Sequence, residues 1–209
     1  MEVGRVRIGV RPSLLALKQA LEVRPVLEKI YPGATFEVLK IETPGDRDKV
    51  TPLTFVDGSD FFTRDIDEAL LTGRIDIAVH SAKDLPDVLA DGLELLFETP
   101  TLSPYDAFVS RNKQRLKDLP PVSRVGLSSL RRSLGIKRLR PDLKIIDIRG
   151  DIDKRLELID KGVIDALIVA HAALLRLGLE EKIAEVFGVD IFSVHPRQGR
   201  LAIVRAKRQ

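Results

Sequence analysis

Short apolar runs and longer amphipathic stretches alternate along the first half of the chain. The short runs are rich in Val and Ile and are typical of buried strands, whereas the longer stretches repeat their apolar residues with a helical period. Strands are predicted at residues 6–10, 35–42 and 76–81, and helices at residues 14–31 and 61–73. Strand, helix and strand in this order form a βαβ unit, so the pattern predicts a parallel sheet.

The same order begins again after residues 99–110. Strands are predicted at residues 124–128, 143–150 and 165–170, and helices at residues 129–140, 151–162 and 171–179. Three stretches resemble earlier ones in the same order: SRVGLSSLRRSL resembles VRIGVRPSLLAL, LKIIDIRGD resembles FEVLKIETPGD, and GVIDALIVAHAA resembles GRIDIAVHSA. Two unrelated βα units can also look alike, but three matches in one order favour an internal duplication that produces two similar α/β domains.

The last segment, residues 199–208, contains a strand-like run with no helix behind it. We expect this run to return to the sheet of the first domain. The predicted domains are therefore residues 1–99 with 200–209, which carry Asp84, and residues 100–199, which carry the SSLRR and RGDIDKR segments. Two chain crossings between domains give a hinge geometry that suits closure on a ligand.

Composition narrows the class of protein. Hydrophobic residues make up 44% of the 209 residues, charged residues 31% and aromatic residues 5%, and this is typical of a globular protein with aliphatic cores. No apolar run or leader suggests a membrane span or a signal peptide, so we expect a cytoplasmic protein without a membrane partner. The net charge of +3 suits an anionic ligand. A nucleic-acid partner is not expected, because the aromatic residues are not interleaved with the basic ones.

Some chemistry is excluded by residue types and motifs. The sequence contains no cysteine, so these residues can form neither a disulfide nor a thiolate nucleophile. The three histidines lack the spacing of metal ligands, and we expect no metal site. GxGxxG, P-loop and nucleophile-elbow motifs are absent, which argues against dinucleotide enzymes, NTPases and α/β-hydrolases.

Candidate binding residues follow the predicted strands. Ligands of open parallel sheets lie beyond the carboxyl ends of the strands, so the residues just after each strand are the first candidates. These are Arg11 and Ser13, then Ser81, Lys83 and Asp84, then Ser128 to Arg132, and then Arg149.

The SSLRR stretch is the sharpest local signal. Ser128 or Ser129 can cap the predicted helix, and Arg131 and Arg132 then lie in its first turn, where cations oppose the helix dipole. Two arginines at this place suggest that an anion binds there. The alternative is that both arginines point into solvent or pair with nearby acids.

Three further arginines add to this set. Arg149 and Arg155 bracket the turn IRGDIDKR, and Arg176 lies in the next predicted helix. Each alone is more often a surface or ion-paired arginine than a ligand contact. Together they form a set of planar, permanently charged groups suited to bidentate recognition of carboxylates or phosphates.

Asp84 follows Lys83 at the end of a predicted strand. A lone Asp is usually structural. A carboxylate among cations would remain ionised, however, and it could stabilise a cationic intermediate or pass a proton to a leaving group.

Taken together, several motifs resemble the porphobilinogen deaminase family, also called hydroxymethylbilane synthase. They are RPSLLAL, TPGD, FFTRDIDEALLTGRIDIAVHSAKDLP, YDAFVS, GLSSLRR, RPDL, RGDIDKRL and LLRLGLE, and they span almost the whole chain. The resemblance implies an α/β fold of two similar domains with type II periplasmic-binding-protein architecture and a ligand cleft between them. It also implies a transferase of tetrapyrrole (heme or corrinoid) biosynthesis, which joins four porphobilinogen units head to tail with loss of ammonia. In that family the linear product grows from a dipyrromethane primer.

The resemblance also implies roles for single residues. Asp84 would contact pyrrole nitrogens, assist departure of the amine and stabilise the azafulvenium cation. Phe62 would lie near the primer, and Gln198 with Gly199 matches part of a family GQG segment. The residues expected to bind substrate or cofactor are Arg11, Ser13, Phe62, Ser81, Lys83, Ser129, Arg131, Arg132, Arg149, Arg155, Arg176, Gln198 and Gly199.

The chain departs from the family pattern in three places. The family attaches its primer to a cysteine in a third domain, which the resemblance does not cover. The family's loop lysines are replaced by Phe55 and Ser59 in FVDGSDFF, and His195, Pro196 and Arg200 alter the GQG region. Three explanations stay open: a primer held without a covalent bond, a separate chain that supplies the cysteine domain, or a cytoplasmic binding or sensor protein for pyrroles or other polycarboxylates.

Overall fold

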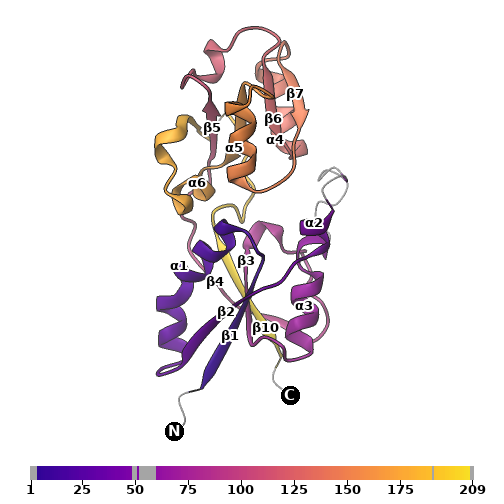
Figure 1. The fold of residues 1–209 in the computed structure, drawn as a ribbon, viewed down its shortest axis with the longest axis vertical. Helices are drawn as coiled ribbons and strands as arrows, with labels where there is room; N and C mark the ends of the chain where they lie inside the picture. The colour runs from indigo at the N-terminus through magenta and orange to yellow at the C-terminus, as the bar shows by residue number, and fades with distance from the viewer. Residues whose placement is uncertain (1–3, 49–50, 52–59, 190, 208–209) are drawn as a thin grey trace. The chain divides into compact units, whose positions relative to one another are not determined.

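A computed structural model describes residues 4–48, 51, 60–189 and 191–207. The chain divides into two compact units (Figure 1). The first unit contains the described residues up to Asp48, those from Asp60 to Thr101, and the segment from Arg200 onward. The second unit contains the described residues from Leu102 to Gly199, together with Thr51.

The first unit is built on a five-stranded sheet with the strand order β2-β1-β3-β10-β4. The strands are β1 (Arg5–Val10), β2 (Thr35–Lys40), β3 (Ile77–Ser81), β4 (Leu93–Glu98) and β10 (Leu201–Ala206). The helices are α1 (Leu14–Ile30), α2 (Pro44–Arg47) and α3 (Arg64–Leu71), and short 3-10 turns span Asp60–Phe62 and Ala82–Asp84.

The parallel pairing predicted for the βαβ strands is confirmed, but the sheet also contains antiparallel pairs. β1 pairs parallel to β2 and β3, but β10 pairs antiparallel to both β3 and β4. The chain reaches β10 from the second unit and not through a crossover helix on this sheet. The βαβ rule that makes neighbouring strands parallel therefore does not apply to β10.

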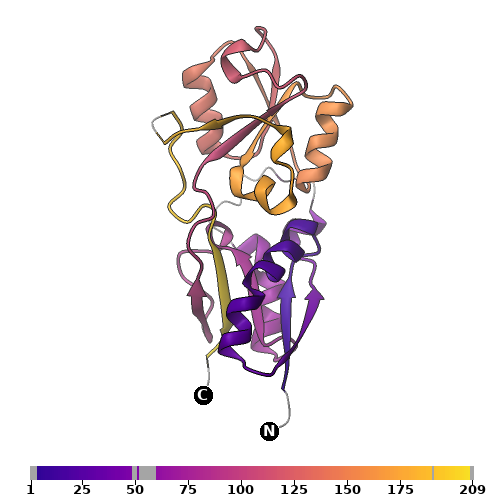
Figure 2. The ribbon, with the colours of Figure 1, turned by 90° about the vertical axis from the view of Figure 1, so that its left-hand side faces the viewer.

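Alternation along the strands builds a core on each face of this sheet. Ile77 and Val79 of β3 pack with α1, whereas Ala78 between them packs with α3. In β10, Leu201 and Ile203 belong to the α1 side and Ala202 and Val204 to the α3 side, and all four are fully buried. The two helices consequently cover opposite faces of the sheet (Figures 1 and 2).

The second unit repeats this plan with the strand order β7-β6-β8-β5-β9. Its strands are β5 (Asp106–Ser110), β6 (Arg124–Leu127), β7 (Lys144–Asp147), β8 (Ala166–Ala170) and β9 (Ile183–Phe187). Its helices are α4 (Leu130–Leu139), α5 (Ile152–Asp160) and α6 (His171–Leu177), with 3-10 turns at Leu116–Asp118 and Glu180–Lys182. β5 takes the place of β10, because it is antiparallel to β8 and β9.

Matching side-chain contacts support the duplication. In β1, Arg7 donates to Asp76 Oδ2 from its backbone N (2.7 Å) and Nε (3.0 Å) and to Oδ1 from Nη2 (2.8 Å). In β6, Arg124 makes the same three bonds to Asp165, at 2.7, 3.1 and 2.9 Å. Both arginines lie two residues before a glycine, Gly9 or Gly126, that is covered by isoleucines. The two units therefore share a topology and its anchoring contacts.

Among the described residues, no helix combines the length and the apolar character that a bilayer crossing requires.

Candidate active site

Asp84 ends a short turn at the carboxyl end of β3. Buried Ala82 and Leu85 flank the turn, and Leu85 N donates to Ala82 O at 3.4 Å. Ala82 N is also held by Arg200 O at 3.0 Å, just before β10. The Asp84 side chain is half-buried, and its carboxylate has no ion pair or hydrogen bond with any residue that the structure describes. The turn therefore fixes the backbone of Asp84 and leaves the carboxylate available.

Two serines of the first unit have defined hydrogen-bond roles. Buried Gln19 of α1 donates from Nε2 to Ser81 Oγ at 2.9 Å, so the Ser81 hydroxyl keeps its own proton to donate elsewhere. Ser13 caps α1, because its Oγ accepts from Ala16 N at 3.2 Å. Ser81 is thus oriented beside Lys83 and Asp84, whereas the Ser13 oxygen is used by the helix.

Arg11 is held between an acid and a ring. Its Nε lies 3.1 Å from Asp46 Oδ1, its Nη2 forms an ion pair with the same carboxylate, and its Cζ lies 4.5 Å from the centre of the Phe62 ring. Burial alone would raise the pKa of Asp46, but hydrogen bonds and charge from Arg11, with donors of Thr43, lower it below its usual value. Asp46 therefore stays ionised and fixes the guanidinium.

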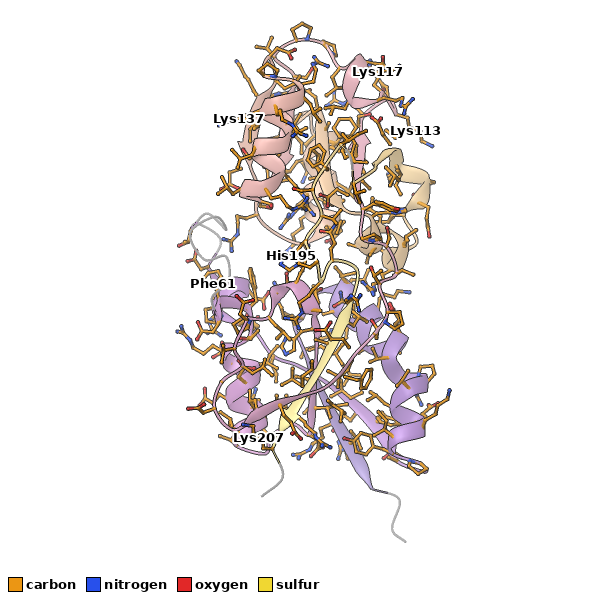
Figure 3. All side chains as sticks on the ribbon, turned by 180° about the vertical axis from the view of Figure 1, so that it is seen from behind. Phe61, Lys113, Lys117, Lys137, His195 and Lys207 are labelled. Carbon is orange, nitrogen blue, oxygen red and sulfur yellow. The ribbon has the colours of Figure 1, made fainter. Side chains whose placement is uncertain are left out.

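Phe62 lies close to the backbone of the TPGD segment. A Cβ at Gly45 would be 2.2 Å from Phe62 Cε1, so only glycine allows this approach. The edge of Phe61, which is labelled in Figure 3, packs against Phe62 with ring centres 5.3 Å apart. The aromatic residue expected near the primer is thereby placed against Arg11.

His80 precedes Ser81 on β3 and is buried. Burial, and then the charge of Arg11, lower the pKa of His80 to about 4, so its imidazole is neutral at physiological pH. Its Nε2 has no hydrogen-bond partner among the described residues.

In the second unit, the two SSLRR arginines meet one buried acid. Arg131 Nη2 lies 2.7 Å from Asp106 Oδ2, and Arg132 Nη2 lies 2.7 Å from Asp106 Oδ1. Asp106 is fully buried, and Arg132 is also buried. Burial would raise the pKa of Asp106, but the two guanidinium groups lower it. Pairing with a nearby acid, the alternative considered for these arginines, therefore accounts for at least one of the donors of each.

The GQG residues adjoin this pair. Gln198 is buried and donates from Nε2 to Pro104 O (2.7 Å), Tyr105 O (3.0 Å) and Asp106 Oδ1 (3.0 Å). Gly199 has a φ of 81°, which favours glycine, and its carbonyl accepts from Arg176 Nη2 at 2.9 Å. The structure thus brings Arg131, Arg132 and Gln198 together and places Arg176 on the neighbouring carbonyl.

Arg149 and Arg155 bind backbone and side-chain oxygens of the second unit. Arg155 donates to Gly150 O at 2.6 Å and to Ser128 Oγ at 2.8 Å, and Arg149 donates to Thr51 O. Ser129 is the N-cap of α4, but its side chain makes no capping bond. Lys113, Lys117 and Lys137 project from the surface of this unit (Figure 3). Part of the basic excess therefore lies on that surface.

Sequence reasoning did not single out three residues that organise these groups. Asp46 and Asp106 lie inside TPGD and YDAFVS, and Gln19 lies on the inner face of α1. No local pattern indicates Asp106, because its arginine partners are 25 and 26 residues away. Phe55 and Ser59 lie outside the described residues.

Similar folds occur in several solved structures. A mutant of the OxyR2 regulatory domain from Vibrio vulnificus aligns with 99% of this chain and 88% of its own, at a TM-score of 0.54 and 14% identity. A lipoprotein from Actinomyces odontolyticus aligns at a TM-score of 0.58 and 11% identity over 100% and 85% of the chains. The Bordetella pertussis BvgS VFT2 domain aligns at 0.53 and 15% identity over 97% and 80%. These likenesses show the type II periplasmic-binding-protein fold.

Sequence relatives are much closer. The porphobilinogen deaminase of Pelobacter propionicus is 45% identical over 203 residues, and that of Ehrlichia canis is 41% identical over 198 residues. These matches cover 97% and 95% of this chain, but only 65% and 66% of the relatives' own lengths. Residues 6–209 match the domain described as "Porphobilinogen deaminase, dipyromethane cofactor binding domain". The chain therefore belongs to the porphobilinogen deaminase family.

Proposed function

We propose that this chain carries the substrate-binding and acid-bearing part of a hydroxymethylbilane synthase-type transferase. Its reaction would be the head-to-tail, deaminative condensation of porphobilinogen in cytoplasmic tetrapyrrole biosynthesis. The observation that carries the proposal is the Asp84 carboxylate, which has no partner among the described residues and lies beside Ser81 and Lys83. A half-buried carboxylate without a partner among the described residues can accept a hydrogen bond from a ligand.

The proposed chemistry breaks one bond and forms another. The carbon–nitrogen bond of the protonated aminomethyl group breaks, and ammonia leaves with the electron pair. The carboxylate of Asp84 accepts a hydrogen bond from the pyrrole N–H and stabilises the positive charge that develops on the ring and its methylene carbon. That carbon then bonds to the free α-carbon of a second pyrrole, which loses its proton to the released ammonia.

The arginines would hold the substrate's acetate and propionate groups. Each pyrrole carries two carboxylates, so a growing chain requires many cations, and guanidinium groups bind carboxylates through two parallel hydrogen bonds. Arg11, Arg131 and Arg155 are each fixed by a neighbouring oxygen, which lowers the entropy lost when a ligand is bound. The Ser81 hydroxyl accepts from Gln19, so it can donate its own proton in a hydrogen bond to a further carboxylate oxygen of the substrate.

The donor set also suits the dipyrromethane named in the domain description. A dipyrromethane has several carboxylates, and buried Arg132 Nε lacks a partner among the described residues. Arg131, Arg132, Arg149 and Arg155 would hold such a group. When bound, it would supply the first pyrrole α-carbon for condensation. Because the sequence contains no cysteine, we propose that these residues hold the primer without a covalent bond of their own.

The state of the primer can be tested by mass spectrometry of the purified chain. Under native conditions we expect a mass increase that matches a dipyrromethane, and under denaturing conditions we expect the mass of the polypeptide alone. A mass increase that survives denaturation would contradict non-covalent binding. Activity that requires a second, cysteine-bearing chain would show that the primer is supplied by a partner.

Turnover separates the enzyme from the rival function, a binding or sensor protein. A binding protein needs the arginines but has no need of Asp84. The purified chain with porphobilinogen should release ammonia and form a linear tetrapyrrole. Asp84→Asn should abolish the release with little loss of binding, whereas the control Asp87→Asn, an exposed acid nearby, should retain it. Binding without ammonia release would favour the sensor function.

A further inference from the structure

Asp106 joins two consecutive arginines at the start of a helix. Arg131 and Arg132 occupy the first turn of α4, and each donates one Nη2 bond of 2.7 Å to a different oxygen of this carboxylate. Without an anion, two adjacent guanidinium groups would repel each other and oppose the helix dipole. The negative charge of Asp106 offsets this repulsion, so the two arginines can lie side by side without a bound ligand.

The carboxylate itself is fixed from its other side. Gln198 Nε2 donates to Asp106 Oδ1 at 3.0 Å, and the same amide is held by Pro104 O at 2.7 Å and Tyr105 O at 3.0 Å. Asp106 is fully buried at the start of β5. A buried, doubly fixed carboxylate restricts the rotamers of any arginine that it binds.

Charge in this cluster remains unbalanced. Two guanidinium groups face one carboxylate, which leaves a net charge of about +1 at the cluster. The two arginines differ in access, because the Arg131 side chain is 24% exposed and the Arg132 side chain only 8%. The remaining positive charge is therefore accessible mainly through Arg131.

We propose that Asp106 is a positioning residue that orients Arg131 to receive one ligand carboxylate while Arg132 remains the buried counter-charge. The inference deepens the proposed function and rests on it for the identity of the ligand. Asp106 itself touches no ligand in this account. It acts by holding the Arg131 guanidinium in one orientation before the ligand arrives, which reduces the conformational entropy lost on binding.

The test uses acetate as a probe and does not depend on catalysis. Arginine side-chain N–H signals are followed by NMR during an acetate titration, and the Arg131 signal is identified by its loss in Arg131→Gln. In the wild-type chain the Arg131 signal should shift with acetate. In Asp106→Asn the initial slope of this shift should fall about tenfold, because the guanidinium loses its charged partner and keeps only the Ser193 carbonyl and the Gln198 amide oxygen. An unchanged or steeper slope would overturn the inference, as would a wild-type chain without an acetate response at Arg131.

Two variants separate positioning from folding. Asp165→Asn breaks a similar arginine pair, that of Arg124, and should lower thermal stability without changing the acetate response. If Asp106→Asn does not fold, Gln198→Leu loosens the carboxylate, removes the 3.5 Å contact between Arg131 Nη2 and Gln198 Oε1, and retains the pairs of both arginines with Asp106. It should reduce the slope several-fold. An unchanged slope in a folded Gln198→Leu variant would also contradict the inference.

The same variants distinguish this inference from the proposed function. Porphobilinogen affinity is measured in parallel by calorimetry. A chain whose Arg131 response to acetate depends on Asp106, but which does not bind porphobilinogen, would refute the proposed function and retain the positioning role. A chain that binds porphobilinogen equally well with and without Asp106 would refute the positioning role alone.

Discussion

Single carboxylates hold three of the candidate arginines. Asp46 fixes Arg11 in the first unit, and Asp106 fixes Arg131 and Arg132 in the second. Buried pairs of this kind contribute little net stability, but they leave a guanidinium in one orientation. Asp84 differs from these acids, because the structure describes no partner for its carboxylate. Fixed cations and one available acid are what the proposed chemistry requires.

Acidification should destabilise the chain through His80. Because the pKa of His80 is about 4 in the folded state and about 6.5 in the unfolded state, the unfolded state binds more protons between these values. The free energy of unfolding should therefore be retained above pH 6.5 and fall as the pH drops toward 4, by up to about 3 kcal/mol.

Urea unfolding at pH 7 and at pH 5 measures this loss of stability. Both pH values lie above the range in which the arginine-paired carboxylates titrate, so these carboxylates keep their charge between them. In His80→Gln the difference between the two pH values should shrink. An equal difference in both proteins would show that another group causes the pH dependence.

A second prediction concerns the contact between Gly45 and Phe62. In Gly45→Ala the new methyl group would lie 2.2 Å from the Phe62 ring, so the ring must move away from Arg11. Overpacking of this kind costs about 1–3 kcal/mol. Chemical denaturation measures the cost, and Gly4→Ala, where no atom lies within 4 Å of the new Cβ, is the control. Equal stability of the two variants would contradict the described contact.

At the level of elements, the two sheets have equivalent strand orders, and each contains one strand that is antiparallel to both of its neighbours. The βα units are arranged alike, and their central strands carry Gly9 and Gly126 under isoleucine side chains. β10 and β5 occupy corresponding antiparallel positions in their sheets. In the sequence, however, β10 follows the βα units of its sheet, whereas β5 precedes those of its own. Each sheet therefore has its own core with the same arrangement of strands and glycines.

Equivalent glycines should respond alike to substitution. A Cβ at Gly9 would lie 2.2 Å from Ile75 Cδ1, and one at Gly126 would lie 2.7 Å from Ile164 Cδ1. Gly9→Ala and Gly126→Ala should each lower the free energy of unfolding by about 1–3 kcal/mol. Denaturant titrations that show a loss in only one variant would argue that the two cores are not equivalent.

The parallel strands and their helices could be predicted from the sequence, because the strands contain short apolar runs and the helices repeat their apolar residues with a helical period. β1, β3, β6 and β8 each contain a short run of apolar residues, and α1 and α5 begin within a residue of the predicted positions. β4, β5 and β9 were not predicted, because their partners are set by long-range antiparallel pairing. The SSLRR arginines showed that an anion was needed, but nothing local indicated that Asp106 provides one.

At the scale of the whole molecule, the chain passes from the first unit to the second and returns. The first sheet therefore depends on β10, whose residues Leu201 to Val204 are fully buried between both of its cores. Each unit otherwise has its own sheet and its own helices. Stability of the first unit should be the property most sensitive to the last strand.

Truncation after Gly199 tests this dependence. Without β10 the first sheet loses a strand between β3 and β4, so the first unit should unfold while the second remains folded. Two-dimensional NMR should then show dispersed signals from the second unit only. Dispersed signals from both units would contradict the account, and the full-length chain serves as the control.

The central claim, that Asp84 promotes the departure of ammonia from a bound pyrrole, is tested most directly by one labelled substrate. Porphobilinogen with ¹⁵N in its aminomethyl group is mixed with the chain, and free ¹⁵N-ammonium is followed by NMR in the wild type and in Asp84→Asn. The account predicts release by the wild type and a rate at least about 10²-fold lower in the variant, with binding retained. Equal rates of release from both proteins, or no release from a wild-type chain that binds the substrate, would contradict it.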